Sequence, residues 1–245
     1  MTEIVKLSGH EIDDAAFLAR FAQAAAQRAP LIVVHGGGKE ISAMQARFGL
    51  ETRTHQGVRI TDGETLEVVR MVLCGAINKR LVRALQETGV DAVGLSGVDG
   101  RLLEAEPMKV EGLDMGFTGT PTCARAELLR ALLAQGFSPV IAPIAYGQAS
   151  DLNINADHAA GALAAALPAE RLVFLSNVDG VLRGGHVVRH LSAAQAEAWI
   201  ADGTISGGMI PKVRTALGAL HSGVAQVSIA SLDSWQNDSA TIFNE

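Results

Sequence analysis

Short apolar runs that end near glycine alternate along this chain with longer segments of helical periodicity. The apolar residues 31–34 are followed by His35, by glycines at positions 36–38, and by a helical pattern over residues 39–48. A short apolar run before a turn predicts a buried strand. Glycines let backbone N–H groups approach a ligand closely, and a helix N-terminus adds free donors and partial positive charge. The segment therefore predicts an anion-binding turn, although a plain strand-to-helix connector has the same pattern.

Three known motifs fail at this turn. A Walker A sequence needs Ser or Thr after its lysine, but Glu40 follows Lys39. The dinucleotide fingerprint needs a third glycine where this chain has Ile41. An HGGG turn can also form a hydrolase oxyanion hole, but the sequence lacks the G-x-S-x-G elbow of that fold. What remains is a phosphate or carboxylate cradle of another kind.

The same patterns extend over the whole chain and predict an α/β fold. Apolar runs predict strands at residues 2–9, 31–34, 91–96, 139–144, 171–176 and, as the last strand, 225–230. Helical spacing predicts helices at residues 13–28, 39–48, 61–86, 155–167, 192–202 and 211–221, and one that follows residues 118–121 and ends at Gly136. Hairpins are expected at residues 49–60 and 101–110, with a further arm at 186–188. This alternation predicts a three-layer αβα sandwich with a central, mainly parallel twisted sheet.

The predicted helix over residues 61–86 is unusually long. Thr61 and Asp62 are good capping residues, and Glu64 supports the first turn. Its length exceeds what one small core needs, so we expect part of it at a subunit interface.

Composition and charge narrow the class of protein. The chain has 245 residues, 48% of them hydrophobic, which suffices for one large domain or two small ones. A net charge of −6 argues against a general affinity for nucleic acid or acidic membranes. The two cysteines, Cys74 and Cys123, form no disulfide framework or zinc pattern. No signal segment or membrane-spanning apolar run is recognisable, so we expect a cytoplasmic protein.

Two lysines occupy positions that break a local rule. Lys6 lies inside the first apolar run, although lysine is depleted in buried strands. It is close to Ser8 and Gly9 at the carboxyl end of that run, where open α/β sheets bind ligands. Lys212 follows Pro211 at the start of a helix, where the helix dipole disfavours a cation by about 0.3–1 kcal/mol. A shared anion would explain both lysines, and solvent-facing side chains are the alternative.

A third position joins an asparagine loop to an alanine-rich helix. Asn155 is a good N-cap, and Asp157 falls in the first turn, where the dipole favours an acid. Ordinary helix capping would explain this pattern by itself. Asn153 lies one step back on the loop and is free to donate to a ligand.

Taken together, these positions resemble the amino acid kinase family, and within it the members that phosphorylate N-acetyl-L-glutamate. The resemblance covers nearly the whole chain, and its specificity comes from the order and spacing of several short segments. The segments are residues 5–9, 34–38, 57–61, 78–79, 153–157, 175–180 and 208–213.

The resemblance implies transfer of a phosphoryl group from ATP to the side-chain carboxylate of N-acetyl-L-glutamate, a step of arginine biosynthesis. Lys6 and Lys212 would lie on either side of the transferred group, and Asp157 would hold both ammonium groups. The backbone of Gly9, Gly37 and Gly38 would donate to the phosphates and to the attacking carboxylate. Arg59 and Asn153 would bind the α-carboxylate and the acetamido end.

The resemblance also implies a division of one domain, residues 1–245, into two lobes. Residues 1–168 would bind the acceptor and residues 169–245 the nucleotide. Mg²⁺ would be carried by ATP, with no metal ligand from the protein. The expected nucleotide-binding residues are Gly9, Asn177, Val178, Asp179, Gly180, Val181, Leu182, Thr204, Ile205 and Ser206.

Some positions depart from the family pattern or leave alternatives open. Ser8 replaces one of two glycines usual in the family, and residues 231–245 look shortened, so their pairing with the sheet is open. Arginine-inhibited relatives carry a helix before the first strand; because Lys6 comes so early, we expect a homodimer without strong arginine feedback.

Two other functions remain open at this point. Residues 74–75 and 95–100 resemble kinases of carrier-linked aminoadipate or glutamate in lysine biosynthesis, whereas 57–61 and 208–212 favour acetylglutamate. A silent ligand-binding regulator on the same fold would be marked by loss of a lysine, and both lysines are present.

Overall fold

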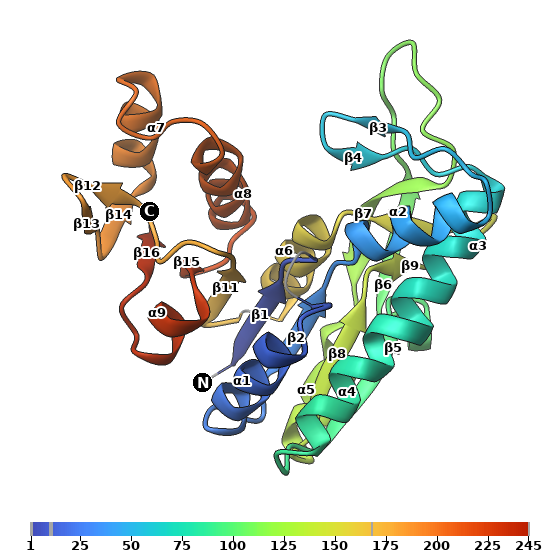
Figure 1. Ribbon diagram of the computed structural model, residues 1–245, viewed down its shortest axis with the longest axis horizontal. Helices are drawn as coiled ribbons and strands as arrows, with labels where there is room; N and C mark the ends of the chain where they lie inside the picture. The colour runs from blue at the N-terminus through green and yellow to red at the C-terminus, as the bar shows by residue number, and fades with distance from the viewer. Residues whose placement is uncertain (1, 10–11, 168, 245) are drawn as a thin grey trace.

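A central eight-stranded sheet runs through the molecule, a computed structural model that describes residues 2–9, 12–167 and 169–244 (Figure 1). Its strand order is β14-β16-β15-β11-β1-β2-β8-β5. The strands are β1 (Glu3–Leu7), β2 (Ile32–His35), β5 (Ala92–Ser96), β8 (Ser138–Ala142), β11 (Arg171–Leu175), β14 (His190–Ser192), β15 (Val227–Ala230) and β16 (Thr241–Asn244). Within the described chain, the one antiparallel pair of this sheet is β15 with β16, so the prediction of a mainly parallel sheet is confirmed.

Helices cover both faces of the sheet. They are α1 (Ala15–Ala26), α2 (Gly38–Arg47), α3 (Gly63–Arg70), α4 (Asn78–Gln86), α5 (Ala126–Ala134), α6 (Ala156–Ala166), α7 (Ala193–Ala201), α8 (Met209–His221) and α9 (Leu232–Gln236). In β1, Ile4 joins the core that contains α5, α6 and α8, whereas Val5 joins the core that contains α1 and α4. Both side chains are fully buried, as expected for a parallel strand that is covered on both faces. The predicted three-layer αβα sandwich is confirmed.

A smaller sheet and two short hairpins complete the fold. The sheet has the order β6-β7-β10-β9, formed by β6 (Leu103–Pro107), β7 (Thr118–Ala124), β10 (Leu152–Ile154) and β9 (Ile144–Ala145). The hairpins are β3 (Thr54–His55) with β4 (Val58–Arg59), and β12 (Leu182–Arg183) with β13 (His186–Val187). In the first hairpin Gln56 and Gly57 have φ of 47° and 81°, which suits a tight two-residue turn and confirms the hairpin predicted there.

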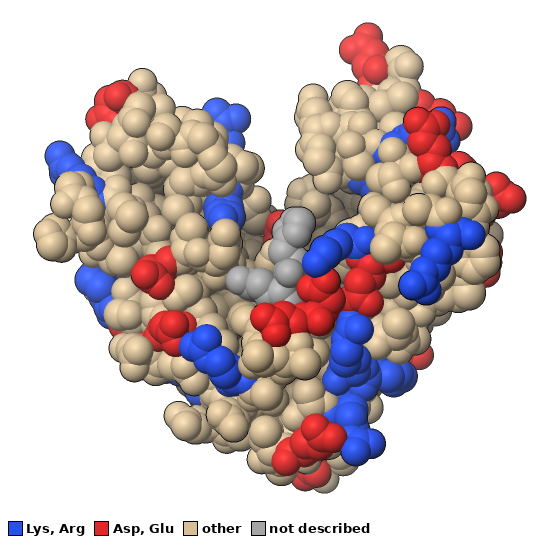
Figure 2. Space-filling model, in the orientation of Figure 1, with Lys and Arg blue, Asp and Glu red and all other residues tan. Residues whose placement is uncertain are grey.

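The elements form two arms that diverge from a shared base (Figure 1). The C-terminal arm carries α7, α8 and the β12–β13 hairpin, and the N-terminal arm carries α2, β7 and the β3–β4 hairpin. The surface is hollowed between the arms (Figure 2). Open parallel sheets bind ligands at the carboxyl ends of their strands, and the turns after β1 and β2 lie at the base of this hollow. No helix in the described part of the chain is long and apolar enough to cross a membrane.

One predicted hairpin was wrong. Residues 101–110 do not fold on themselves; Leu103–Pro107 pairs instead with Thr118–Ala124, a stretch whose beginning was expected to lead directly into a helix. Pro121 is tolerated in β7 because it lies opposite Ala105, beside the register shift between Glu104 and Ala105.

The C-terminal end and the start of α8 also differ from expectation. Val227–Ala230 is not the last strand, because Thr241–Asn244 returns antiparallel to it and closes against β14. The doubt about the pairing of this segment is thereby resolved for the described residues up to Asn244. Helix α8 begins at Met209, so Pro211 is its third residue, still within the first turn, where its missing N–H leaves no bond unmade.

The long helix predicted over residues 61–86 is present but contains a π-helical segment. Asp62 is the N-cap and accepts a hydrogen bond from the N–H of Thr65 at 2.9 Å. Between α3 and α4 lies η1 (Met71–Ile77), a seven-residue π-helix. π-helical insertions are rare in proteins, and those that occur often lie at functional sites. This insertion lies directly behind the glycine turn.

Candidate active site

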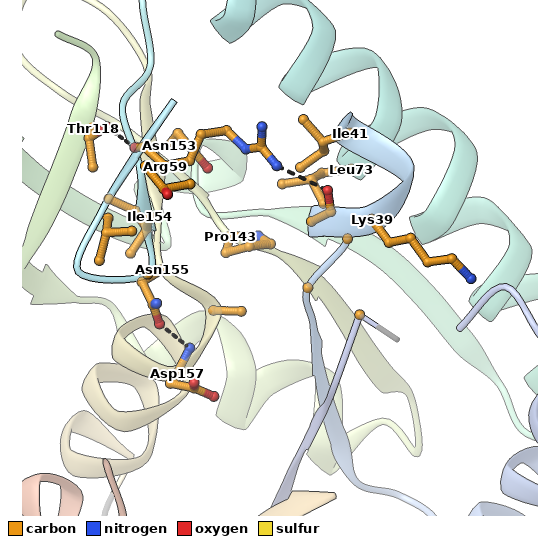
Figure 3. Close-up of a pocket in the computed structure, with 18 of the residues that line it drawn as sticks. Lys39, Ile41, Arg59, Leu73, Thr118, Pro143, Asn153, Ile154, Asn155 and Asp157 are labelled. Carbon is orange, nitrogen blue, oxygen red and sulfur yellow. Dashed lines mark hydrogen bonds between the residues drawn. The ribbon is translucent and has the colours of Figure 1, made fainter. Parts of the chain in front are cut away.

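An ion pair between a central strand and a helix N-terminus forms the floor of the site. Lys6 projects from β1, which is flanked on both sides by other strands, and so is not an edge-strand lysine. Its Nζ lies 2.7 Å from Oδ1 of Asp157, and the two side chains are 14% and 30% exposed. Asn155 caps α6 by accepting from the N–H of Asp157 at 2.8 Å (Figure 3). The helix dipole therefore favours an ionised Asp157, which in turn stabilises a charged Lys6.

The turns after β1 and β2 touch each other beside this ion pair. A Cβ added to Gly9 would lie 2.9 Å from the backbone N of Gly37 and 3.2 Å from that of Gly38. Such a contact cannot be relieved by rotating a side chain, so the turn after β1 requires glycine at position 9. A Cβ on Gly37 would also collide with Ile77 of the π-helical segment. The packing thus places the backbone of the three predicted glycines together at the N-terminus of α2.

A buried neutral histidine holds the glycine turn from behind. His35 is fully buried, its Nδ1 lies 3.1 Å from the carbonyl of Gly36, and its Nε2 lies 3.3 Å from Nδ2 of Asn78. Because the Gly36 carbonyl can only accept, Nδ1 donates and Nε2 accepts. Asn78 also donates to the carbonyl of Val140 at 2.9 Å, which ties the turn to β8. Burial lowers the pKa of His35 to about 4, so the imidazole is neutral near pH 7.

A cavity of about 560 Å³ opens from these turns towards the β3–β4 hairpin (Figure 3). It is lined by Lys6, by the glycines of both turns and by Arg59 of the hairpin. Lys39 belongs to the rim, but its side chain points away from Arg59 and pairs with Asp13 at 2.5 Å. The lining includes Lys6, Gly9, Gly36, Gly37, Gly38, Ser42, Thr52, Arg59, Thr118, Asn153 and Asp157.

Arg59 is held by neutral groups. One terminal nitrogen donates to the carbonyl of Gly38 at 3.0 Å and to Oγ of Ser42 at 2.9 Å. The other donates to Oε1 of Gln45 and, at 3.5 Å, to Oγ1 of Thr52. Among the residues that the structure describes, none forms an ion pair with Arg59. Burial lowers the pKa of Arg59 from its ordinary value, which still leaves the guanidinium charged at neutral pH.

Asn153 lies in the same cavity within a small hydroxyl network. Its Nδ2 donates to Oγ1 of Thr61 at 3.0 Å. Oγ1 of Thr118 donates to the backbone carbonyl of Arg59 at 2.6 Å, which anchors the hairpin to β7. The prediction that Arg59 and Asn153 face one ligand site is therefore supported by their shared cavity, although no contact between the two side chains is seen.

A second cavity of about 210 Å³ brings Lys212 towards Lys6 and Asp157. All three residues line it, together with residues at the carboxyl end of β11 and Thr215 of α8. Lys212 does not pair with Asp157, however. Its Nζ donates to Oδ1 of Asn177 at 3.2 Å, on the C-terminal arm. The structure thus places the two lysines around one cavity and pairs only Lys6 with the carboxylate.

Of the expected nucleotide-binding residues, Gly9 lines the larger cavity, whereas the others belong to the C-terminal arm and line neither cavity. Asp179 accepts from Oγ of Ser231 at 2.5 Å, and the N–H of Val181 donates to Oγ1 of Thr241 at 2.8 Å. The side chains of Val181 and Ile205 are buried in the core, whereas Leu182 is 53% exposed. Asn177 contacts Lys212, which shares the second cavity with Lys6 and Asp157 but does not pair with either.

Sequence reasoning missed two polar residues that organise the site. Gln45 and Asn78 are 0% and 1% exposed, and each lies on the apolar face of its helix. The signal was available, because Gln45 follows Ile41 by four residues and Asn78 precedes Leu81 by three. A polar residue at an apolar position of a helical pattern is the mark of a buried hydrogen-bonding role.

The fold and the site define the class of protein. The sequence profile described as the amino acid kinase family matches residues 1–231, and the chain belongs to this family. It is 48% identical over 245 residues to an acetylglutamate kinase of Roseiflexus sp. (strain RS-1). This match covers 100% of this chain and 94% of that protein. An acetylglutamate kinase of Geobacillus thermodenitrificans (strain NG80-2) is 43% identical over 233 residues, covering 94% and 90%.

A solved structure agrees in fold. The crystal structure of a protein from Streptococcus mutans UA159 superposes with a TM-score of 0.79 at 26% identity. The match covers 99% of this chain and 98% of that one. The arrangement of sheet and helices is therefore shared over the full length.

Burial of His35 predicts that the free energy of unfolding depends on pH. The pKa of His35 is about 4 in the folded chain and 6.5 ordinarily. Between these values the unfolded chain binds a proton that the folded chain does not, so lowering the pH favours unfolding. We expect the free energy of unfolding of wild type, taken relative to that of His35→Gln, to fall by on the order of 3 kcal/mol when the pH is lowered from 7 to 4. Urea denaturation across this range measures it, and a difference that is constant with pH would contradict the assignment.

Proposed function

We propose that this chain phosphorylates the side-chain carboxylate of N-acetyl-L-glutamate with ATP, giving an acyl phosphate and ADP in arginine biosynthesis. The observation that carries the proposal is one cavity lined by two cations, Lys6 of the ion pair and Arg59 of the hairpin, together with the glycines of both turns. An acceptor with two carboxylates and an acetamido group matches this cavity. The acetylglutamate kinases that are 48% and 43% identical to the chain support the same acceptor.

The reaction needs charge neutralisation more than proton transfer. A carboxylate is already ionised at neutral pH, so no general base is required. Its oxygen forms the new bond to the γ-phosphorus, while the bond from that phosphorus to the leaving oxygen of ADP breaks. The obstacle is repulsion between two anions, which ammonium groups and backbone N–H donors reduce.

Each expected residue has a role in this scheme. Lys6 and Lys212 would flank the transferred phosphoryl group, with Asp157 holding Lys6 and, once the arms approach each other, Lys212. The N–H groups of Gly9, Gly37 and Gly38 would donate to phosphate and carboxylate oxygens. Arg59 would bind the α-carboxylate of the acceptor and Asn153 its acetamido end. These two are favoured for that role because both line the acceptor cavity.

The nucleotide would bind on residues 169–245 and the acceptor on residues 1–168. Contacts to ATP would come from residues 177–182 and 204–206, on the arm that carries Lys212. Among the described residues no group of three His, Cys, Asp or Glu side chains is placed to hold a metal ion. We expect Mg²⁺ to be carried by the phosphate oxygens of ATP, on which such ions lean rather than on protein cages. When bound, Mg²⁺ would neutralise part of the phosphate charge.

The net charge of −6 favours small-molecule partners over nucleic acid, and a cytoplasmic location fits a biosynthetic kinase.

We also propose a homodimer formed at the edge of the central sheet. β5 is the edge strand, and Val93 and Leu95 within it are only partly buried. The adjoining π-helical segment leaves Met71 53% exposed. This apolar edge, together with the long helix beside it, is the surface that we expect a second copy to cover.

Light scattering with size-exclusion chromatography tests the dimer. We expect a mass of twice the 25.6 kDa of the chain. Met71→Glu places a charge in the contact and shifts the mass towards the monomer. Leu182→Glu is the matched control, because Leu182 is equally exposed but lies on the other arm. A monomeric wild type at micromolar concentration would refute the proposal.

An assay of ADP release with defined acceptors tests the function. We expect turnover with N-acetyl-L-glutamate, and trapping of the acyl phosphate by hydroxylamine as the hydroxamate. Aminoadipate or glutamate linked to a carrier protein is the competing acceptor. Phosphorylation of the carrier-linked acceptor alone would replace the proposal, and binding of acceptor without turnover of either would indicate a regulator.

Variants of the two lysines test the site assignment. Lys6→Ala and Lys212→Ala should each lower kcat by on the order of 10²–10³, because each removes a cation that is needed most in the transition state. Nucleotide affinity, measured by fluorescence of a bound ATP analogue, should change far less. Lys109→Ala removes an exposed lysine from the loop after β6 and should leave kcat unchanged. Wild-type turnover in either site variant would overturn the assignment.

A further inference from the structure

Arg59 is a half-buried cation whose hydrogen-bond partners are unusual. A buried charge is ordinarily matched by an opposite charge, since desolvation is costly. Arg59 instead donates to a backbone carbonyl, to two hydroxyls and to the side-chain amide of Gln45. All four of these acceptors are neutral. The positive charge is therefore uncompensated by the described residues and is available to an anion in the cavity.

Gln45 is the most buried of the side chains that hold Arg59. It is 0% exposed and lies with Ile41 on the buried face of α2. Its Nε2 donates to Oγ1 of Thr65 at 3.0 Å and, at 3.4 Å, to the carbonyl of Glu51. Because a carbonyl can only accept, these contacts fix the amide with Oε1 turned to Arg59. Oε1 also accepts from Oγ1 of Thr52 at 3.0 Å.

This arrangement joins three separate elements, of which α2 and β4 contribute residues to the lining of the acceptor cavity. Gln45 belongs to α2, Arg59 to β4, and Thr65 to α3. The same guanidinium donates to the carbonyl of Gly38, which begins α2 beside the glycine turn. The position of Gln45 thus sets where Arg59 lies relative to the glycine turn.

We propose that Gln45 is a positioning residue for the acceptor: it orients Arg59 without neutralising it, so that the full positive charge faces the carboxylate that does not react. The proposal rests on the proposed function. The proposal turns on the neutral amide at position 45. A glutamate side chain there would have nearly the same shape and could accept the same hydrogen bonds from Arg59. A carboxylate there would compete with the α-carboxylate of the acceptor for one guanidinium.

Gln45→Glu and Gln45→Leu separate positioning from packing. Gln45→Glu keeps the contact with Arg59 but cancels its charge, so KM for N-acetyl-L-glutamate should rise about tenfold or more, with kcat and KM for ATP little changed. Gln45→Leu loses the hydrogen bond but leaves the charge, so KM should rise less. A purely structural role predicts the reverse order, since leucine would lose all four contacts of the amide.

Two controls isolate the charge effect. Gln23→Glu makes the same chemical change on the exposed side of α1, away from the cavity lining, and should leave KM unchanged. 4-Acetamidobutyrate keeps the acetamido group and the reacting carboxylate but lacks the α-carboxylate. Wild type and Gln45→Glu should therefore differ far less in their kcat/KM for this acceptor than for N-acetyl-L-glutamate.

The outcomes distinguish this inference from the function on which it rests. Calorimetric titration with N-acetyl-L-glutamate gives affinities that do not depend on turnover. A wild type that binds the acceptor but does not phosphorylate it overturns the function, while a weaker affinity in Gln45→Glu still supports the role of Gln45. An active wild type with an unchanged KM in Gln45→Glu overturns the role of Gln45 alone. A wild type that does not bind the acceptor overturns both.

Discussion

The ion pair between Lys6 and Asp157 is the interaction on which the rest of the site depends. It places a lysine near the carboxyl end of a central parallel strand, where burying an unpaired ammonium group would be costly. Asp157 can pay back that cost because the capped N-terminus of α6 stabilises its carboxylate. Removing either partner would leave an unpaired charge at the base of the hollow. The glycine turns and both cavities are built around this fixed pair.

The site combines groups that the fold holds neutral with groups that it holds charged. His35 is buried and neutral, so it can brace the glycine turn without adding a charge beside the phosphoryl path. Arg59 is charged, and all of its hydrogen-bond partners among the described residues are neutral. The two choices are complementary: supporting groups carry no net charge, and the charges that exist face open space. Such preorganised electrostatics is what transfer between two anions requires.

The sequence predicted those parts whose cause is local. The run from β2 through the glycines to α2 is encoded in adjacent residues, and the capping of α6 by Asn155 follows the same logic. The pairing of Leu103–Pro107 with Thr118–Ala124 was missed because ten intervening residues carry no turn signal that specifies the partner. Gln45 was missed because its place on an apolar helix face indicates a buried hydrogen bond but does not identify the partner, which lies on another element. The roles of residues 177–182 and 204–206 stay predictions, since they rest on the resemblance alone.

The contact between Lys212 and Asn177 has a consequence for the hydrolysis of ATP in the absence of an acceptor. In the structure this ammonium group is held by a neutral amide on the C-terminal arm, and its partner lysine lies at the base. Under the proposed function, the complete cationic shield would form only when both reactants draw the arms together. If water took the place of the acceptor, it would bring no negative charge to draw the arms together. The geometry thus disfavours futile hydrolysis of the nucleotide when the acceptor is scarce.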